Sequence, residues 1–319
     1  MNDDHHFLPQ FYLKGFLGDN KRLYYCRKKY ETYNDVSPAG IYYEPGLNYI
    51  DLGEYGHIDL ENDFFKEKDD RYAKAFRDFR DSYNYDLGAT PLQTKADIVD
   101  FVLGLFWRVP GRWKRVVDVL NVNGLLTGSL GLKNKETGQW YTDAEIPNII
   151  QDIKDKEVNQ KAFMTYYYHE NLLRYNWDEL EQKFHIFETS EPMIIGDIPY
   201  VPLKSENKMG HILEEFMIPL DKNHIIVYAN KCPSFLETNV LYLFYQYIID
   251  GASVKIACSD KGYLKQMMHQ SKTLHERIEK SRLGNNKEHV LYNVLAFESR
   301  FLSFEEFKKY HADLLKQAN

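Results

Sequence analysis

The sequence predicts an α+β protein, with a mainly helical body around a small, mostly antiparallel C-terminal sheet. Two patterns support this prediction. Between about residues 57 and 182, apolar residues repeat at helical spacing with charged residues between them. After Lys183 the chain changes to short runs rich in β-branched and aromatic residues, bounded by Pro, Asn, Asp and Gly. Helices and strands that occupy separate stretches of a chain are typical of the α+β class.

The expected elements follow from the same patterns. Residues 9–17 should form a helix that starts at Pro9, residues 22–27 a strand, and the Gly-, Pro- and Tyr-rich residues 28–56 a loop. Longer helices are expected at 57–83, 94–108, 143–156, 157–182, 236–250, 260–283 and 303–317, and a short one at 113–120. Strands are expected within 184–190, 192–203, 214–220 and 223–229, and at 253–259. The second half of helix 94–108 is apolar nearly all round, which predicts a central position.

Domain organisation is less sharply defined by the sequence. One domain over residues 1–319 is expected, and a division into a mainly helical sub-lobe, 1–182, and a sub-lobe of sheet plus helices, 183–319, stays open. The Gly-rich segment 124–138 lacks the Gly-Lys-Ser/Thr ending of a phosphate-binding loop, so it is interpreted as a plain connection.

Composition indicates a soluble, cytoplasmic protein without a membrane partner. No apolar run approaches the ~20 residues that a membrane helix needs, and the polar N-terminus does not resemble a signal peptide. Three widely spaced cysteines, Cys26, Cys232 and Cys258, show no metal-ligand spacing and suit a reducing compartment. The net charge of −7 means that nucleic-acid binding would need a local basic patch.

Several segments together resemble one family. The opening HHFLPQFYLKGF (5–16), the acidic helix around Glu61, FWRVPGR (106–112), FETSEPMIIGDIPYVPL (187–203) and FMIPLDKNHIIV (216–227) occur in its order. These segments resemble the bacterial family known as domain of unknown function 4238. The resemblance implies a soluble protein and candidate residues but no reaction. The family's Thr-Ser-Asp-Asn-Pro string is broken here, so its acid could correspond to Glu191 or Asp197; Asp197 is favoured because it precedes x-Pro.

Polar residues within these segments form a candidate catalytic set. His5 or His6, Glu61, Arg108 and Asp197 are expected to line one cleft. The two histidines point to opposite faces of an extended segment, so one could act while the other packs. A histidine with two carboxylates could hold a divalent metal and activate water. The alternative is a structural ion-pair network around a buried arginine.

Two functions remain open from the sequence. One is a metal-assisted phosphodiester hydrolase of the nuclease kind, in which Trp107 and Trp113 stack bases and Arg112 contacts phosphate. Its partner would be a nucleic acid or another anionic ligand. The other is a non-catalytic recognition module that binds a peptide or small anionic ligand in a Tyr-rich groove, suggested by the 25 tyrosines.

Overall fold

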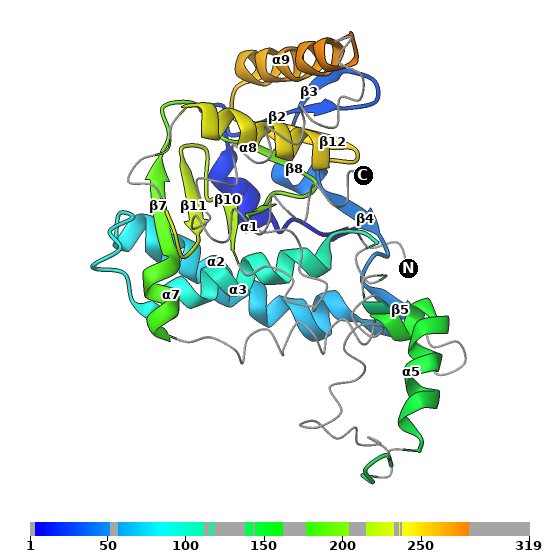
Figure 1. Cartoon of the computed structure of the whole chain (residues 1–319). Helices are drawn as coiled ribbons and strands as arrows, with labels where there is room; N and C mark the ends of the chain where they lie inside the picture. The colour runs from blue at the N-terminus through cyan, green and yellow to red at the C-terminus, as the bar shows by residue number, and fades with distance from the viewer. Residues whose placement is uncertain are drawn as a thin grey trace, which may run out of the picture.

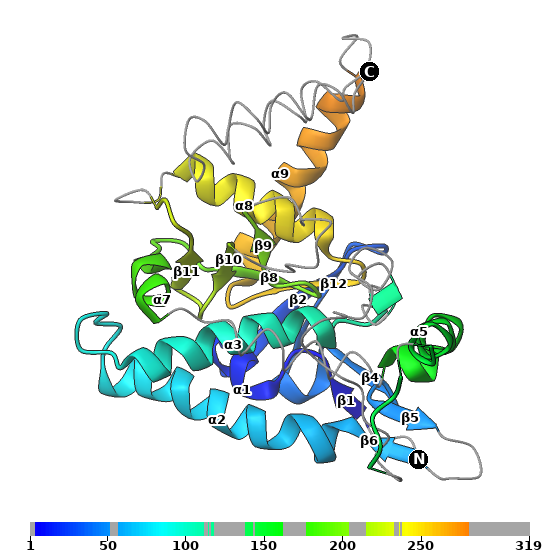
Figure 2. The same cartoon turned by 60° about the horizontal axis from the view of Figure 1, so that its bottom comes forward.

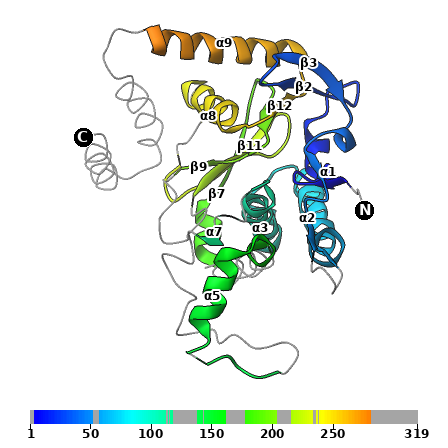
Figure 3. The same ribbon diagram turned by 90° about the vertical axis from the view of Figure 1, so that its right-hand side faces the viewer.

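The computed structural model describes residues 4–51, 57–111, 114, 116–117, 138–142, 144–161, 177–203, 215–232, 236 and 238–280. Helices α2 (Lys66–Arg77) and α3 (Leu92–Arg108) lie side by side on one side of the strands. Helices α8 (Thr238–Gly251) and α9 (Lys261–Lys280) lie on the other side (Figure 1, Figure 2). Helix α5 (Ile146–Asp155) projects away from these layers (Figure 3).

Within the described residues, the strands form two four-stranded sheets and two small pairs, and each of these pairings is antiparallel. The first sheet has the order β7 (Phe184–Glu188), β11 (His224–Tyr228), β10 (Phe216–Pro219), β9 (Val201–Pro202). The second has the order β3 (Thr32–Val36), β2 (Leu23–Arg27), β12 (Lys255–Cys258), β8 (Ile194–Gly196). The pairs are β1 (Asp4–His6) with β4 (Tyr43–Pro45), and β5 (Tyr49–Asp51) with β6 (His57–Asp59).

The α+β class and the antiparallel pairing are confirmed, and one four-stranded sheet lies in the C-terminal part, but the strands are not confined to that part. Strands β2 and β3 come from the N-terminal region and pair with β12, so one sheet joins the two ends of the described chain. The predicted loop at 28–56 was also wrong, because it contains β3, β4 and β5. These strands are three to five residues long and depend on partners elsewhere in the chain, so local sequence pattern identifies them poorly.

The predicted helix at 57–83 begins later than expected. Residues 57–59 form β6, and the helical segment then runs through α2 with wide, π-type turns at Glu61–Phe65 and Asp78–Ser82. The predicted helix at 94–108 is confirmed as α3. It ends where Val109 becomes extended, as expected of a residue that precedes a proline.

Helix α3 lies in the core, as its apolar sequence predicted. Phe101 packs against Tyr72 and Phe76 of α2, with ring centroids 5.8 Å and 4.9 Å away. Phe106 lies 6.3 Å from Tyr200, which precedes β9, so α3 joins α2 to the strands. The short helix α1 (Gln10–Leu13) contributes Tyr12, whose hydroxyl donates a 2.7 Å hydrogen bond to the Pro219 carbonyl. The N-terminal segment is therefore docked on the first sheet.

Some predictions lie outside the described residues. These are the helix at 303–317, nearly all of the Gly-rich segment 124–138, and most of the helix at 113–120. Of the predicted helix at 157–182, its first residues and α7 (Trp177–Lys183) are described. The division into sub-lobes stays a prediction. Within the ranges that the structure describes, the helices lack the length and apolar character needed to cross a bilayer.

Candidate functional site

His5 lies on β1 in a buried position, held by main-chain and aromatic contacts. Asn48 donates its backbone N–H to His5 Nδ1 at 2.9 Å, and the Tyr49 ring meets the imidazole edge-on at 4.6 Å between centroids. Because Nδ1 accepts this hydrogen bond, the ring proton is on Nε2, which faces the Asp59 carboxylate at 4.0 Å. His5 is only 2% exposed, so its nitrogens are enclosed by the protein.

Asp59 begins the helical segment that contains Glu61. Its Oδ1 accepts the backbone N–H of Glu61 at 3.0 Å and that of Asn62 at 3.4 Å, which is the role of a helix N-cap. The π-type turn that follows places the Glu61 side chain beside Asn48. The Asn48 amide donates to Glu61 Oε2 at 2.7 Å, so Asn48 links the histidine strand to the start of this helix.

Arg108, the last residue of α3, completes this cluster. Its Nη1 and Nη2 donate to the two oxygens of Asp69 at 2.6 Å and 3.0 Å, and Nη2 lies 3.6 Å from Glu61 Oε2. The guanidinium carbon is 4.3 Å from the centre of the Phe65 ring. A cation at a helix C-terminus is favoured by the helix dipole, and the bidentate pair fixes its orientation.

We call these six residues the N-terminal network: His5, Asn48, Asp59, Glu61, Asp69 and Arg108. The structure thus brings His5, Glu61 and Arg108 together, as the sequence predicted. Their polar atoms are largely engaged with one another. Among the residues that the structure describes, no three His, Cys, Asp or Glu side chains are grouped as ligands for one metal ion.

His6 and Asp197 lie in other surroundings. The His6 ring packs 5.6 Å from Tyr43, and burial lowers the His6 pKa, an effect that the Glu61 charge offsets in part. Asp197 accepts hydrogen bonds from Ser253 Oγ at 2.8 Å and from the backbone N–H groups of Val254 and Lys255 at 2.5 Å and 3.0 Å. Its carboxylate therefore ties the end of β8 to the start of β12. None of the bonds found for Asp197 joins it to the N-terminal network.

Of the three predicted substrate-binding residues, only Trp107 lies within the described part of the chain. Trp107 is 1% exposed and belongs to the hydrophobic core, so its ring is not placed to stack on a base. Arg112 and Trp113 lie outside the described residues.

A groove of about 760 Å³ runs between α8, α9 and the turn after β7. We call it the tyrosine-rich groove; its described lining is Ser190, Glu191, Leu241, Tyr242, Tyr245, Tyr263, Gln266, Met267 and Gln270. The α8 tyrosines stand three residues apart, and the α9 residues recur at three- and four-residue steps. Each set therefore occupies one helix face. This helical spacing of tyrosines and glutamines is a signal of the groove that the sequence itself carries.

Tyr245 and Tyr263 contact each other in the wall of the groove. The Tyr245 hydroxyl donates to Met193 Sδ at 3.4 Å, and the Tyr245 and Tyr263 rings meet edge-on with centroids 6.2 Å apart. Burial raises the pKa of Tyr263 to about 12. Its hydroxyl therefore keeps its proton at neutral pH and remains a hydrogen-bond donor.

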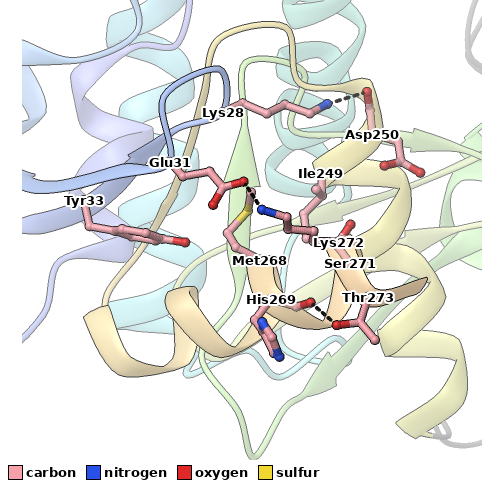
Figure 4. Close-up of a pocket in the computed structure, with 10 residues that line it drawn as sticks. All are labelled: Lys28, Glu31, Tyr33, Ile249, Asp250, Met268, His269, Ser271, Lys272 and Thr273. Atoms are coloured by element: carbon pink, nitrogen blue, oxygen red, sulfur yellow. Dashed lines mark hydrogen bonds and ion pairs between the residues drawn. The ribbon is translucent and has the colours of Figure 1, made fainter. Parts of the chain in front are cut away.

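A second pocket, of about 750 Å³, lies on the other side of α9, between that helix and the β2–β3 hairpin (Figure 4). Its charged groups are paired within the protein. Lys28 Nζ donates to the carbonyls of Asp250 and Ala252 at 3.0 Å and 2.9 Å, which caps the C-terminal end of α8. Lys272 pairs with Glu31 at 2.8 Å. The Lys28 ammonium group therefore has a structural role at the end of α8.

Comparison with known proteins adds one match. A family model described as "Protein of unknown function (DUF4238)" matches residues 4–241. This range contains the whole N-terminal network and Asp197, whereas most of the tyrosine-rich groove lies beyond its end. Curated proteins and solved structures give no match to the chain.

Proposed function

Because the chain belongs to the DUF4238 family, whose description states no activity, we propose a function from its own geometry: a non-catalytic recognition module that binds a peptide in the tyrosine-rich groove. The observation that supports it is the groove itself, open between two helices and lined by three tyrosines. Aromatic-lined grooves of this kind accept extended peptides, because flat rings pack on proline and aliphatic side chains while hydroxyls bond the peptide backbone.

The chemistry of the lining favours a peptide over a small anion. The described lining includes no Lys, Arg or His, and its one carboxylate is Glu191. An anion would enter without a cationic partner, in a protein whose net charge is already −7. A peptide can instead bury apolar side chains against the rings and satisfy its amides with tyrosine and glutamine groups.

The test is selection from a random peptide display library on immobilised full-length protein, followed by fluorescence polarisation with the selected peptides. Tyr263→Ala should weaken binding at least about tenfold, because truncation of an aromatic anchor at an interface commonly has that effect or more. Tyr30→Ala is the matched control, since Tyr30 is exposed on the β2–β3 hairpin. Equal loss in both variants, or none in either, would contradict the assignment to the groove.

Metal-assisted phosphodiester hydrolysis is the second candidate. It is favoured by the convergence of His5, Glu61 and Arg108, and by the Glu61 side chain, which remains 30% exposed at the edge of the network. A divalent metal would have to bind Glu61 from the solvent side, where it could polarise a phosphate or activate water. The proposal predicts cleavage of DNA or RNA oligonucleotides with added Mg²⁺, Mn²⁺ or Zn²⁺. Cleavage should disappear in Glu61→Gln and persist in Glu179→Gln, an exposed surface carboxylate.

A further inference from the structure

Resting on the proposed function, we infer that the tyrosine-rich groove selects a proline-containing peptide with one basic residue, which pairs with Glu191 in the groove lining. Three features of the groove favour this class of partner: the position of Glu191, the amides of α9, and the distribution of charge on the two sides of that helix.

Glu191 is held in place by its backbone while its side chain is exposed. The Thr189 hydroxyl donates to the Glu191 carbonyl at 2.9 Å, and the Thr189 N–H donates to the Asn223 carbonyl at 2.7 Å. Pro192 follows and restricts the next backbone dihedral. These hydrogen bonds hold the turn against the β10–β11 hairpin. The backbone that carries the Glu191 carboxylate therefore has a defined position.

The Glu191 charge reaches the wall of the groove. It raises the pKa values of Tyr245 and Tyr263, for both of which burial is the larger cause. In the part of the chain that the structure describes, Glu191 forms no ion pair. An incoming Arg or Lys would therefore meet a carboxylate that need not first release another cation.

The second groove wall offers amide groups at a regular spacing. Gln266 and Gln270 are one helical turn apart on α9 and lie on the same face as Tyr263. Each amide can donate to a peptide carbonyl and accept from a peptide N–H. An extended proline-containing segment presents carbonyls that its own backbone leaves unbonded, and it loses little conformational entropy on binding because it is already extended.

The pocket on the other side of α9 shows the contrasting arrangement (Figure 4). There the acidic residue Glu31 is paired with Lys272, and Lys28 is bound to the end of α8. A basic ligand entering that pocket would compete with Lys272 for Glu31. The difference in pairing points to the Glu191 side as the one that takes a cationic partner.

The experiment compares two peptide sets by isothermal titration calorimetry on full-length protein. One set has the form Pro-x-x-Pro with a single flanking Arg; the other carries Glu in place of that Arg. The Arg peptides should bind about tenfold tighter than the Glu peptides, as expected when one charge pair is replaced by one repulsion at a partly exposed rim. Glu191→Lys should reverse the preference, whereas Glu31→Lys should leave it unchanged.

The outcomes separate this inference from the function on which it rests. Reversal by Glu191→Lys alone supports it. Binding of both sets with equal affinity, abolished by Tyr263→Ala, would overturn the charge selection and leave peptide recognition standing. Failure of both sets, and of peptides from the display library, would overturn both. Arg preference that survives Glu191→Lys would place the basic residue elsewhere and contradict the inference.

Discussion

The polar groups of the N-terminal network and those of helices α8 and α9 differ in how completely they are hydrogen-bonded. In the network, Asn48 bonds both His5 and Glu61, and Arg108 holds Asp69 with two hydrogen bonds. On α8, the Tyr245 hydroxyl donates to the Met193 sulfur, and both side-chain polar atoms of Gln246 are buried with no hydrogen-bond partner in the described structure. The charged groups of the network therefore bind one another, whereas Gln246 on α8 has no hydrogen-bond partner among the described residues.

The largest effect should come from breaking the partly buried ion pair of Arg108 with Asp69. Arg108→Ala leaves Asp69 without its bidentate partner and should lower the free energy of unfolding by about 3–5 kcal/mol. Arg80→Ala removes an exposed pair with Asp81 and should change it by less than about 1 kcal/mol. Denaturant titration followed by circular dichroism measures both. A folded, fully stable Arg108→Ala protein would show that this ion pair does not stabilise the fold.

The next largest effect is a predicted gain in stability from a substitution on α8. Gln246→Met should raise the free energy of unfolding by about 1–3 kcal/mol, because it replaces a buried, unsatisfied amide with an apolar side chain of similar length. Gln160→Met is the matched control. Gln160 is also buried, but its Nε2 donates to the Lys154 carbonyl at 2.8 Å, so this change should destabilise. Destabilisation by both changes would mean that Gln246 is satisfied in solution.

Two helix caps allow the regions to be compared directly. Asp59 caps the helical segment of the network, and Asp260 accepts the Tyr263 N–H at 2.7 Å at the start of α9. Either change to Ala should cost about 0.5–2 kcal/mol through the lost cap. Asp59→Ala should lie at the upper end, because it also removes the carboxylate that faces His5 Nε2. Equal losses would indicate that His5 gains nothing from Asp59.

The smallest effect is expected from pH at the tip of the β10–β11 hairpin. Burial raises the pKa of Asp221, but hydrogen bonds from His224, Tyr85 and Asn223 outweigh it and hold the pKa below its ordinary value. A depressed folded-state pKa stabilises the protein above the unfolded value of about 3.9, and this contribution is lost as pH falls through the folded value. Asp221→Asn should therefore flatten the acid limb of unfolding free energy against pH. An unchanged acid limb would rule out Asp221 as a contributor.

Part of the N-terminal network could be predicted from the sequence, because the signal lies in short continuous segments. His5, Glu61 and Arg108 were recognised because they are polar residues beside strongly apolar runs, and buried polar groups need partners. Asp69 and Asn48, the partners that complete the network, carried no such signal, because one is among many acids on an amphipathic helix and the other lies in a turn. Asp197 was expected in the same cleft, but its bonds go to the backbone at the start of β12.

What the sequence by itself determined is helices α3, α8 and α9, the α+β class and the family, because these depend on periodicity and motif order within continuous stretches. Tertiary structure decided which strands share a sheet, since β2 and β12 are separated by more than two hundred residues and pair only after the chain has folded. Tertiary structure also decided which polar residues form hydrogen bonds and ion pairs with one another. Hydrogen-bond partners are fixed by three-dimensional distance, and no local pattern encodes that Glu61 lies beside an arginine while Glu191 has no ion-pair partner among the described residues.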